Sequence, residues 1–377
     1  MKIVICGLAI TSSWGNGHAT TFRALTKALH ERGHRVVFFE KDLYWYADNR
    51  DLPHPGFCAV RIFRDWKKAT SEIKRELADA DVAMVGSYFP DGIAAIDLLL
   101  DSRVPVTVFY DIDTPITVAQ LRSEGSTPYL RRDQIPAIDL YFSFTGGPLL
   151  NELETIFEAK RALPLYCSFD ERLYHRREVG KRYRCDLSYM GTYATDRQPK
   201  IDELFVKVAQ QQPERSFILA GPQYPKSIRW PKNVRRVEHL NPRWHPHLYS
   251  SSRFVLNVTR RDMVACGYSP SVRLFEAAAC GATIVSDNWP GLETFFDPAT
   301  EILLPTSSED VLTYINDVEE SAIRRIGDAA QARVLEAHTS NQRALEFEDA
   351  VRSAVSHTHR SRLDQPVETR ELIRASL

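Results

Sequence analysis

The feature that most constrains this fold is a series of short apolar runs in which hydrophobic residues follow one another without alternation. Such runs occur at residues 3–7, 36–39, 81–86, 104–110 and 140–144. A strand that is apolar at successive positions is buried on both faces, as in a parallel sheet covered by helices. Between the first two runs, Phe22, Leu25 and Leu29 recur at helical spacing and Gly33 ends the helix. The pattern predicts repeated βαβ units.

The same alternation of runs and helices restarts in the second half of the chain. We expect strands at 187–191, 216–221, 254–258 and 282–287 and helices at 199–210 and 271–280. A chain of 377 residues is long enough for two such cores. The predicted organisation is an N-terminal Rossmann-like domain (1–165), a connection (166–185), a C-terminal Rossmann-like domain (186–340), and a closing helix with a loose tail (341–377).

Charge and cysteine usage limit the function classes. The 48 Lys and Arg residues balance 49 Asp and Glu residues, for a net charge of −1, so no global field favours nucleic acid or an anionic membrane. The six cysteines contain no C-x-x-C pair, which argues against zinc sites and a disulfide framework. No apolar run reaches the roughly 18 residues of a membrane span. We expect a cytoplasmic protein with no nucleic-acid partner and no membrane span.

The loop Gly15-Asn16-Gly17-His18 lies between the first strand and the first helix. A glycine-rich turn lets backbone N–H groups approach a ligand, and a helix N-terminus favours anions. Thr20 stands where a dinucleotide-binding motif would need its third glycine, which disfavours that motif. The glycines could also serve only the entry into the helix. His18 lies at the carboxyl edge of the predicted sheet, where an imidazole can act as a base.

Two aspartates follow another predicted strand of the same sheet. Asp111 and Asp113 come directly after residues 104–110, on the same carboxyl edge as His18. Either aspartate could orient the imidazole for catalysis. Alternatively, the pair and the following Thr114-Pro115 could form a capped turn, which is the commoner use of aspartate at such a position.

The strongest local signal lies in residues 268–281. Ser269 resembles a helix N-cap, Pro270 fits the first helical position, and Gly281 ends the helix. The free N–H groups at the start of such a helix can bind phosphate. Glu276 is a carboxylate within an apolar stretch, so it needs a hydrogen-bond partner, either a backbone amide or a hydroxyl pair of a ligand.

Four segments carry a family resemblance that covers nearly the whole chain. They are GNGHATTFRALTKALHERGHRVVFFE, YMGTYATDRQPKIDELF, LNVTRRDM and RLFEAAACGATIVSDNWPGLETFF, and the last is the most specific. The chain resembles the CgeB-type spore-maturation glycosyltransferases, a branch of the GT-B group. The resemblance implies an α/β fold in which two Rossmann-like domains with parallel sheets face each other across a cleft. The C-terminal domain would bind the nucleotide-sugar donor and the N-terminal domain the acceptor.

The resemblance also implies residue roles. Glu276 would bind the ribose hydroxyls of the donor, and Arg260 or Arg261 with the following helix N-terminus would neutralise its diphosphate. The donor-binding set is Gly17, Gly191, Thr192, Arg197, Gly221, Arg260, Tyr268, Ser269, Ser271 and Glu276. Tyr268 stands where many retaining relatives carry a second glutamate. His18 matches the base of inverting relatives, so the catalytic set is His18, Asp111 and Asp113.

The predicted function is a glycosyltransferase that moves a sugar from a nucleoside diphosphate donor to a carbohydrate or another acceptor. Phosphate stabilisation by the helix start and Arg260 would replace a metal ion. The D-x-D in a suitable position, Asp111-Ile112-Asp113, lies in the predicted acceptor half. We therefore expect no metal and no cofactor. The alternatives are a nucleotide-sugar epimerase of the same fold and a catalytically silent sugar-binding or assembly protein.

Aromatic residues are frequent in the predicted acceptor half, including the run Tyr44-Trp45-Tyr46. These rings could stack on sugar rings. Packing within the protein is the favoured interpretation, because large aromatic side chains dominate cores generally.

Overall fold

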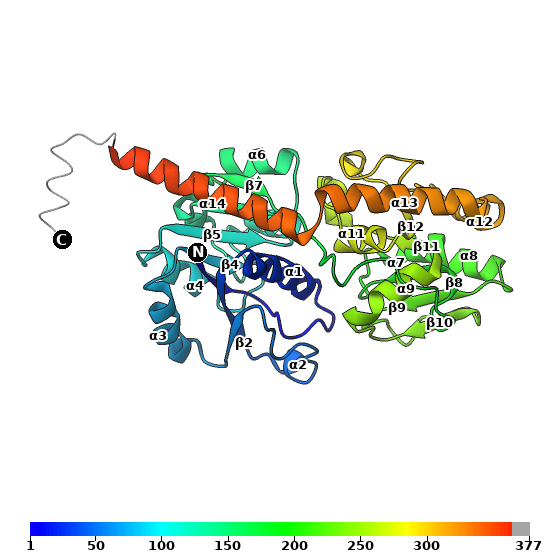
Figure 1. The fold of residues 1–377 in the computed structure, drawn as a ribbon, viewed down its shortest axis with the longest axis horizontal. Coiled ribbons are helices and arrows are strands. Elements are labelled where there is room, and N and C mark those ends of the chain that lie inside the picture. Colours follow the sequence, from blue (N-terminus) through cyan, green and yellow to red (C-terminus); the bar gives the residue numbers. More distant parts are fainter. Residues whose placement is uncertain (364–377) are drawn as a thin grey trace, which may run out of the picture.

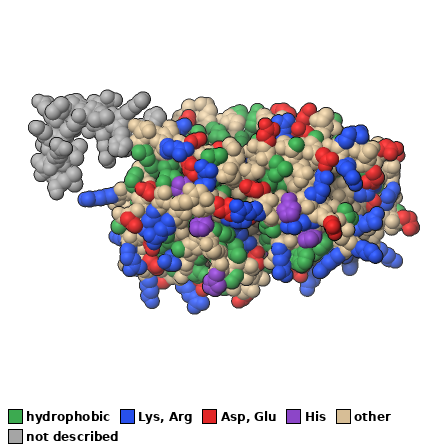
Figure 2. Space-filling view, in the orientation of Figure 1, with side chains coloured by type: hydrophobic (Ala, Val, Ile, Leu, Met, Phe, Trp, Pro, Cys, Tyr) green, Lys and Arg blue, Asp and Glu red, His purple; other side chains and the backbone are tan. Residues whose placement is uncertain are grey.

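The computed structural model describes residues 1–363, with side-chain placement through Ser356. Two parallel sheets lie side by side along the long axis of the molecule, each covered by helices (Figure 1). We call residues 1–165 the N-terminal half and the rest of the described chain the C-terminal half. Charged side chains of both signs are interspersed over the face shown in Figure 2, in keeping with the net charge of −1.

The N-terminal sheet has seven parallel strands in the order β3-β2-β1-β4-β5-β6-β7. Its strands are β1 (Lys2–Cys6), β2 (Arg35–Lys41), β3 (Ala59–Phe63), β4 (Val82–Gly86), β5 (Val106–Asp111), β6 (Leu140–Ser143) and β7 (Ala162–Pro164). Its helices are α1 (Gly17–Glu31), α2 (Tyr44–Ala47), α3 (Trp66–Leu77), α4 (Gly92–Leu100), α5 (Thr114–Glu124), η1 (Arg132–Ala137) and α6 (Pro148–Thr155).

Burial on both faces of this sheet explains the continuous apolar runs. In β1, Ile3 and Ile5 belong to one core cluster, whereas Val4 and Cys6 belong to another on the opposite face. Successive side chains of a strand point to opposite faces, so both faces of β1 are covered. The prediction of a parallel sheet buried on both sides is confirmed.

The C-terminal sheet has five parallel strands in the order β10-β9-β8-β11-β12. Its strands are β8 (Cys185–Met190), β9 (Phe217–Ala220), β10 (Val234–Val237), β11 (Ser252–Asn257) and β12 (Thr283–Ser286). Its helices are α7 (Gln198–Ile201), η2 (Asp202–Val206), α8 (Lys207–Gln211), η3 (Pro242–Trp244), α9 (His245–Ser251), α10 (Arg261–Cys266), α11 (Val272–Ala279), η4 (Leu292–Thr294), α12 (Ser308–Asp317) and α13 (Glu320–Ala337).

The last helix returns to the first sheet. α14 (Ser340–Leu363) contacts α1, β5 and β6, while α13 contacts α11 and β12 of the second sheet (Figure 1). At the turn between them, Arg343 is buried and donates to the Tyr166 and Ala337 carbonyls. The predicted closing helix is present and extends to Leu363, and the part of the predicted tail at 364–377 lies outside the described residues.

The strands that the sequence did not predict lie at or next to sheet edges. β3, β7 and β10 are short, and β3 is only partly buried along its length. An edge strand has one neighbour and less burial, so it needs no continuous apolar run. The predicted helix at 199–210 is confirmed as α7, η2 and α8 in direct succession.

Candidate active site between the two sheets

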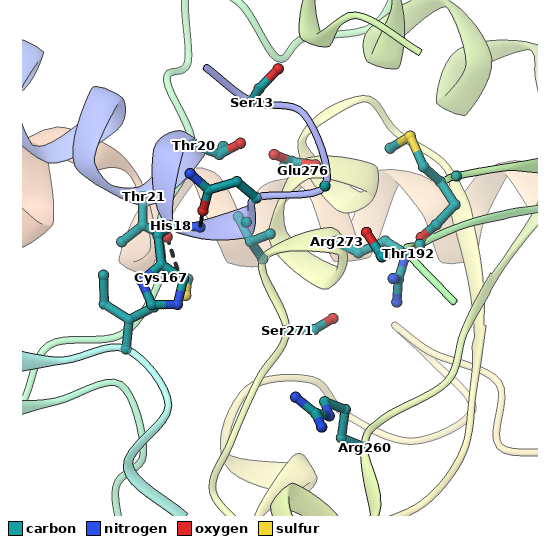
Figure 3. A pocket seen from close by; sticks show the side chains of 18 of the residues that line it. Ser13, His18, Thr20, Thr21, Cys167, Thr192, Arg260, Ser271, Arg273 and Glu276 are labelled. Carbon is teal, nitrogen blue, oxygen red and sulfur yellow. Dashed lines mark hydrogen bonds between the residues drawn. The ribbon is translucent and has the colours of Figure 1, made fainter. Parts of the chain in front are cut away.

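The carboxyl edges of both sheets line one cavity of about 520 Å³. The N-terminal half contributes the loop after β1, the start of α1 and the segment after β5, and the C-terminal half contributes the segments after β8, β9 and β11. Figure 3 shows Ser13, His18 and Thr20 on one side of this cavity and Arg260, Ser271 and Glu276 from the other half. Ligands of parallel α/β sheets bind at this edge.

His18 is held at the start of α1. Asn16 caps the helix, and its side-chain oxygen accepts a hydrogen bond from the His18 backbone N–H at 3.1 Å. The imidazole Nε2 lies 2.9 Å from Asp113 Oδ2. Although Asp113 occupies the N-cap position of α5, its side chain makes no capping bond to that helix. Of the two aspartates, Asp113 is therefore the one that orients His18.

This pairing fixes which nitrogen of His18 is available. An ionised carboxylate only accepts hydrogen bonds, so Nε2 carries the proton that faces Asp113. The other nitrogen, Nδ1, is buried and has no hydrogen-bond partner among the described residues. Tyr88 packs edge-on against the imidazole with 5.6 Å between ring centroids. The arrangement leaves Nδ1 as the atom that can accept a proton.

Asp111 does not reach the cavity, which corrects its prediction as a catalytic residue. It is fully buried and accepts hydrogen bonds from Tyr141 Oη at 2.6 Å and Thr117 Oγ1 at 2.9 Å. Burial raises the pKa of Asp111 to about 6. As the last residue of β5 it points into the protein, whereas Asp113 lies in the turn beyond the strand.

The helix that lines the cavity from the C-terminal half starts later than predicted. α11 begins at Val272 with Ser271 at its N-cap, so Ser269 is not the cap. Ser269 lies at the cavity wall and donates to the Gly267 carbonyl at 2.8 Å. Ser271 donates to Asn257 Oδ1 at 2.7 Å instead of capping α11. The first N–H groups of α11 therefore lack a side-chain cap at the cavity wall.

Glu276 lines the cavity although its side chain is almost fully buried. Its Oε2 accepts a hydrogen bond from Tyr249 Oη at 3.1 Å and lies 3.8 Å from His245 Nδ1. Its Oε1 is buried and has no partner within the described part of the chain. Of the two predicted alternatives, a bond to a neighbouring amide is not made. Oε1 is therefore an unmet acceptor beside a cavity, which suits a hydroxyl donor on a ligand.

A small network holds this carboxylate in place. Burial, together with the nearby Glu276 carboxylate, raises the pKa of Tyr249 well above its usual value, so its hydroxyl keeps the proton that it donates. His245 Nε2 faces the Leu240 carbonyl at 3.0 Å, and its Nδ1 lies 3.1 Å from Tyr174 Oη. Each neighbour of Glu276 is itself fixed, which orients Oε2 and leaves only Oε1 open.

Three arginines of the C-terminal half line the cavity: Arg197, Arg260 and Arg273. Arg197 and Arg260 each have a buried Nε without a hydrogen-bond partner among the described residues, although Arg260 Nε is 3.8 Å from Asp196. Arg261 does not line the cavity and is exposed. The expectation that one member of the Arg260–Arg261 pair faces the cleft therefore agrees with the structure.

Arg273 lines the cavity but was not predicted as a site residue. This buried arginine donates to the Met190 carbonyl and to Asn257 Oδ1, the latter at 2.6 Å, and stacks over the Tyr189 ring at 4.9 Å. The sequence could have indicated this role, because Arg273 is a charged residue in an apolar helix. It stands three positions before Glu276 and hence on the same face of the helix.

The remaining predicted donor-site residues lie together with one exception. Gly17, Gly191, Thr192 and Gly221 all line the cavity. A Cβ at Gly221 would lie 1.9 Å from the Gly191 carbonyl oxygen, and its φ of +145° is a glycine conformation, so only glycine fits there.

Tyr268 is the exception and a correction. It does not line the cavity; its ring packs between Gly147 and Gly291, where added Cβ atoms would lie 2.3 and 2.4 Å from ring carbons. Its carbonyl accepts from Gly146 N–H at 3.0 Å and its N–H donates to the Pro290 carbonyl at 2.7 Å. Tyr268 therefore joins the two halves instead of facing a donor.

The aromatic run Tyr44-Trp45-Tyr46 of the N-terminal half is only partly packed, which corrects another expectation. Tyr46 is buried and lines the cavity, but Tyr44 and Trp45 are 77% and 40% exposed.

Within residues 1–363, no group of three or more His, Cys, Asp or Glu side chains could hold a metal ion. No helix in the described part of the chain is long and apolar enough to cross a membrane.

Comparison with known proteins identifies the fold. Residues 197–349 match the family described as glycosyl transferase-like. Sucrose-phosphate synthase from Thermosynechococcus elongatus aligns with 95% of this chain and 100% of its own, with a TM-score of 0.68 and 13% identity. The fold is GT-B. No curated protein matches the chain in sequence.

Two further solved structures each align with more than nine-tenths of this chain. An alpha-glucosyltransferase in complex with UDP-glucose and DNA containing an abasic site aligns with 93% of this chain and 99% of its own, with a TM-score of 0.69 and 15% identity. Anabaena HepE in complex with UDP and glucose aligns with 94% of this chain and 100% of its own, with a TM-score of 0.66 and 13% identity. Residues 197–349 thus match a glycosyl transferase-like family model, and the fold of the chain is GT-B.

Proposed function

We propose that the chain is a metal-independent glycosyltransferase that moves a sugar from a nucleoside diphosphate to a hydroxyl of a carbohydrate acceptor. One observation carries the proposal: the unmet Glu276 Oε1 and the oriented His18–Asp113 pair come from opposite halves and line the same cavity. A transferase needs both a donor-binding side and a proton-accepting side, and here each half supplies one.

The donor is proposed to lie against the C-terminal half. Glu276 Oε1 accepts a hydrogen bond from a ribose hydroxyl, while Arg260, Arg197 and the uncapped start of α11 face the phosphates. We propose uridine as the first nucleotide to test, because the alpha-glucosyltransferase and HepE structures contain UDP or UDP-glucose. The family branch (CgeB-type), the sugar and a cytoplasmic location stay predictions.

The proposed reaction is a single displacement. The acceptor hydroxyl oxygen bonds to the anomeric carbon of the sugar, and the bond from that carbon to the diphosphate oxygen breaks. The electron pair leaves with the nucleoside diphosphate, and His18 Nδ1 takes the hydroxyl proton. Because Nδ1 is covered in the free protein, acceptor binding must be accompanied by a small movement of the side chain or of the cleft.

Charge on the leaving diphosphate is proposed to be stabilised by arginine and backbone N–H groups, without metal or cofactor. A screen of nucleoside diphosphates by thermal unfolding tests the donor site, since a ligand at 100 times its dissociation constant adds about 2.7 kcal/mol of stability. Sugar transfer should then proceed at an unchanged rate in excess EDTA. No stabilisation by any nucleoside diphosphate would contradict the proposal, and an epimerase would instead form product without an acceptor.

A further inference from the structure

A second cleft lies at the opposite edge of the C-terminal sheet. It is lined by Cys185, Ser252 and Thr283, which are the first residues of β8, β11 and β12, and has a volume of about 1420 Å³. The donor side of the first cavity lies beyond the other ends of the same strands. Six residues of β8 at about 3.3 Å each place the two ends of the sheet roughly 20 Å apart, and Tyr249 is the one described residue that lines both cavities.

Positive charge is concentrated in this cleft. Seven cationic side chains line it: Arg176, Arg177, Lys181, Arg184, Arg215, Arg253 and Arg324. Only two carboxylates, Asp186 and Glu320, line it as well. Since the whole chain has a net charge of −1, this local excess of cations is a feature of the cleft and not of the protein as a whole.

Internal ion pairs account for only part of this charge. Arg215 and Arg253 pair with Asp186, Arg253 also pairs with Glu320, and Arg176 pairs with Asp328 outside the cleft. The other four cations, Arg177, Lys181, Arg184 and Arg324, have no carboxylate partner within the described residues. Arg177 also has a buried Nε without a hydrogen-bond partner in that part of the chain.

The shape and lining of the cleft restrict the ligand that these cations could bind. Like charges held in one concave site repel each other, and a bound polyanion removes that repulsion. A flat bilayer does not fit a concave site. Single-stranded nucleic acid needs exposed rings for base stacking, whereas the single aromatic lining residue, Tyr249, is fully buried.

We propose that this cleft binds a compact polyphosphate, with phosphate groups held by Arg177, Lys181, Arg184 and Arg324. Arginine suits this ligand because its planar fork donates two parallel hydrogen bonds to phosphate oxygens. The phosphates could come from an inorganic chain or from a nucleoside polyphosphate. The site shares only Tyr249 with the proposed donor cavity among the described lining residues, and its existence does not depend on the transferase activity.

Calorimetric titration of the full chain with inorganic triphosphate tests the site. The variant K181A/R184A/R324A should bind at least about tenfold more weakly than the wild type, because three charge-assisted contacts are lost. The matched control K226A/R229A/K232A removes the same charge from exposed positions outside the cleft and should bind within about twofold of the wild type. Thermal unfolding without ligand checks that both variants fold.

Three results would overturn the proposal: no binding by the wild type, equal losses in both triple variants, or full binding by the cleft variant. The last result would place the anion elsewhere, including the donor cavity. If the cleft triple variant fails to fold, Arg184→Glu alone should still weaken binding. Repeating the titration with ATP distinguishes the ligand sources, since equal affinities would mean that only the phosphates are bound, and tighter ATP binding would point to a nucleoside polyphosphate.

Discussion

The two walls of the central cavity differ in how their polar groups are satisfied. Behind the N-terminal wall, Glu40 accepts three hydrogen bonds from Ile10 and Thr11, and Asp51 accepts from Ser13 and Arg23. Neither carboxylate lines the cavity. These contacts hold the loop after β1. On the C-terminal wall, hydrogen-bonding atoms remain open on three lining residues, Arg197, Arg260 and Glu276.

This contrast separates two tasks. Open acceptors and donors in fixed positions suit a ligand of constant chemistry, such as a nucleotide with its hydroxyls and phosphates. A wall whose loop is held by internal contacts has one buried side-chain atom without a hydrogen-bond partner among its described lining residues, His18 Nδ1. That atom is available for a reaction on acceptors whose shape the wall does not prescribe. Substitutions on the two walls should therefore affect different steps.

The largest expected effect is on turnover and belongs to the N-terminal wall. His18→Ala should lower the transfer rate at saturating donor by about 10²–10⁴-fold, the usual effect of losing a general base. Affinity for the nucleoside diphosphate should stay within about twofold, because His18 is on the opposite wall. Steady-state kinetics and calorimetry measure the two quantities.

The stereochemistry of the product decides the mechanism independently of that rate. A single displacement inverts the anomeric centre, so NMR of the initial product should show the configuration opposite to that of the donor. A product of retained configuration would exclude His18 as the base of a single displacement. If His18→Ala instead loses nucleotide affinity as strongly as it loses turnover, the assignment of nucleotide binding to the C-terminal wall alone is wrong.

A second effect separates Asp113, which lies on the N-terminal wall, from Asp111, which lies behind it. The pKa of Asp111 is raised by burial from 3.8 to about 6 in the folded protein. Its contribution to stability is therefore fully present below about pH 3.8 and is lost as the pH rises through 6. Relative to Asp111→Asn, the wild type should lose up to about 3 kcal/mol between pH 4 and pH 7, measured by urea unfolding.

Asp113→Asn is the matched control for that experiment. Asp113 lines the cavity and contacts His18, so its substitution should lower turnover and leave the pH dependence of stability close to that of the wild type. If Asp111→Asn instead lowers turnover as strongly as Asp113→Asn, the assignment of Asp111 to the interior is wrong for the working enzyme.

These aspartates also show how far the sequence can predict the site. Both lie at the carboxyl end of one predicted strand, and the sequence alone predicts both at the cleft edge. Which one faces the cleft depends on where β5 ends and on Tyr141, a residue of the neighbouring strand. Short-range sequence patterns thus predicted both sheets and the positions of His18 and Glu276 at the cavity. Each of these depends on a local strand, turn or helix.

Residues whose position depends on distant contacts were not predicted. Tyr268 packs between two glycines, one of them more than a hundred residues away in the sequence. Its role as a joint between the halves follows from that packing and leaves no local pattern. Arg273 is the first residue of the segment RLFEAAACGATIVSDNWPGLETFF. Its partners Met190 and Asn257 belong to β8 and β11, so its burial depends on the assembled sheet.

On the C-terminal wall, the largest expected effect is that of Glu276→Gln. Loss of a charged acceptor should weaken binding of the nucleoside diphosphate by about 1.5–3 kcal/mol in calorimetry. The nucleoside alone should weaken by a similar amount, because the lost contact is to the ribose. Turnover at saturating donor should change less than affinity.

Tyr249→Phe is the control for this variant. It removes the hydroxyl that holds Oε2 at 3.1 Å and leaves Oε1 in place, so its effect on affinity should be smaller than that of Glu276→Gln. Unchanged affinity in Glu276→Gln, together with a lower melting temperature, would mean that this carboxylate only stabilises the C-terminal half.

The smallest expected effect distinguishes two neighbouring arginines of the C-terminal wall. Arg260 lines the cavity with its side chain 42% exposed, so Arg260→Ala should weaken the nucleoside diphosphate by about 1 kcal/mol and the nucleoside hardly at all. Arg261→Ala removes the same charge next to it but outside the cavity, and should change neither affinity. The loss in Arg260→Ala should also shrink at high salt, because a partly exposed ion pair is screened. Equal losses for nucleoside and nucleoside diphosphate would show that Arg260 shapes the wall without contacting phosphate, and an equal loss in Arg261→Ala would show that the effect comes from the general field of this half.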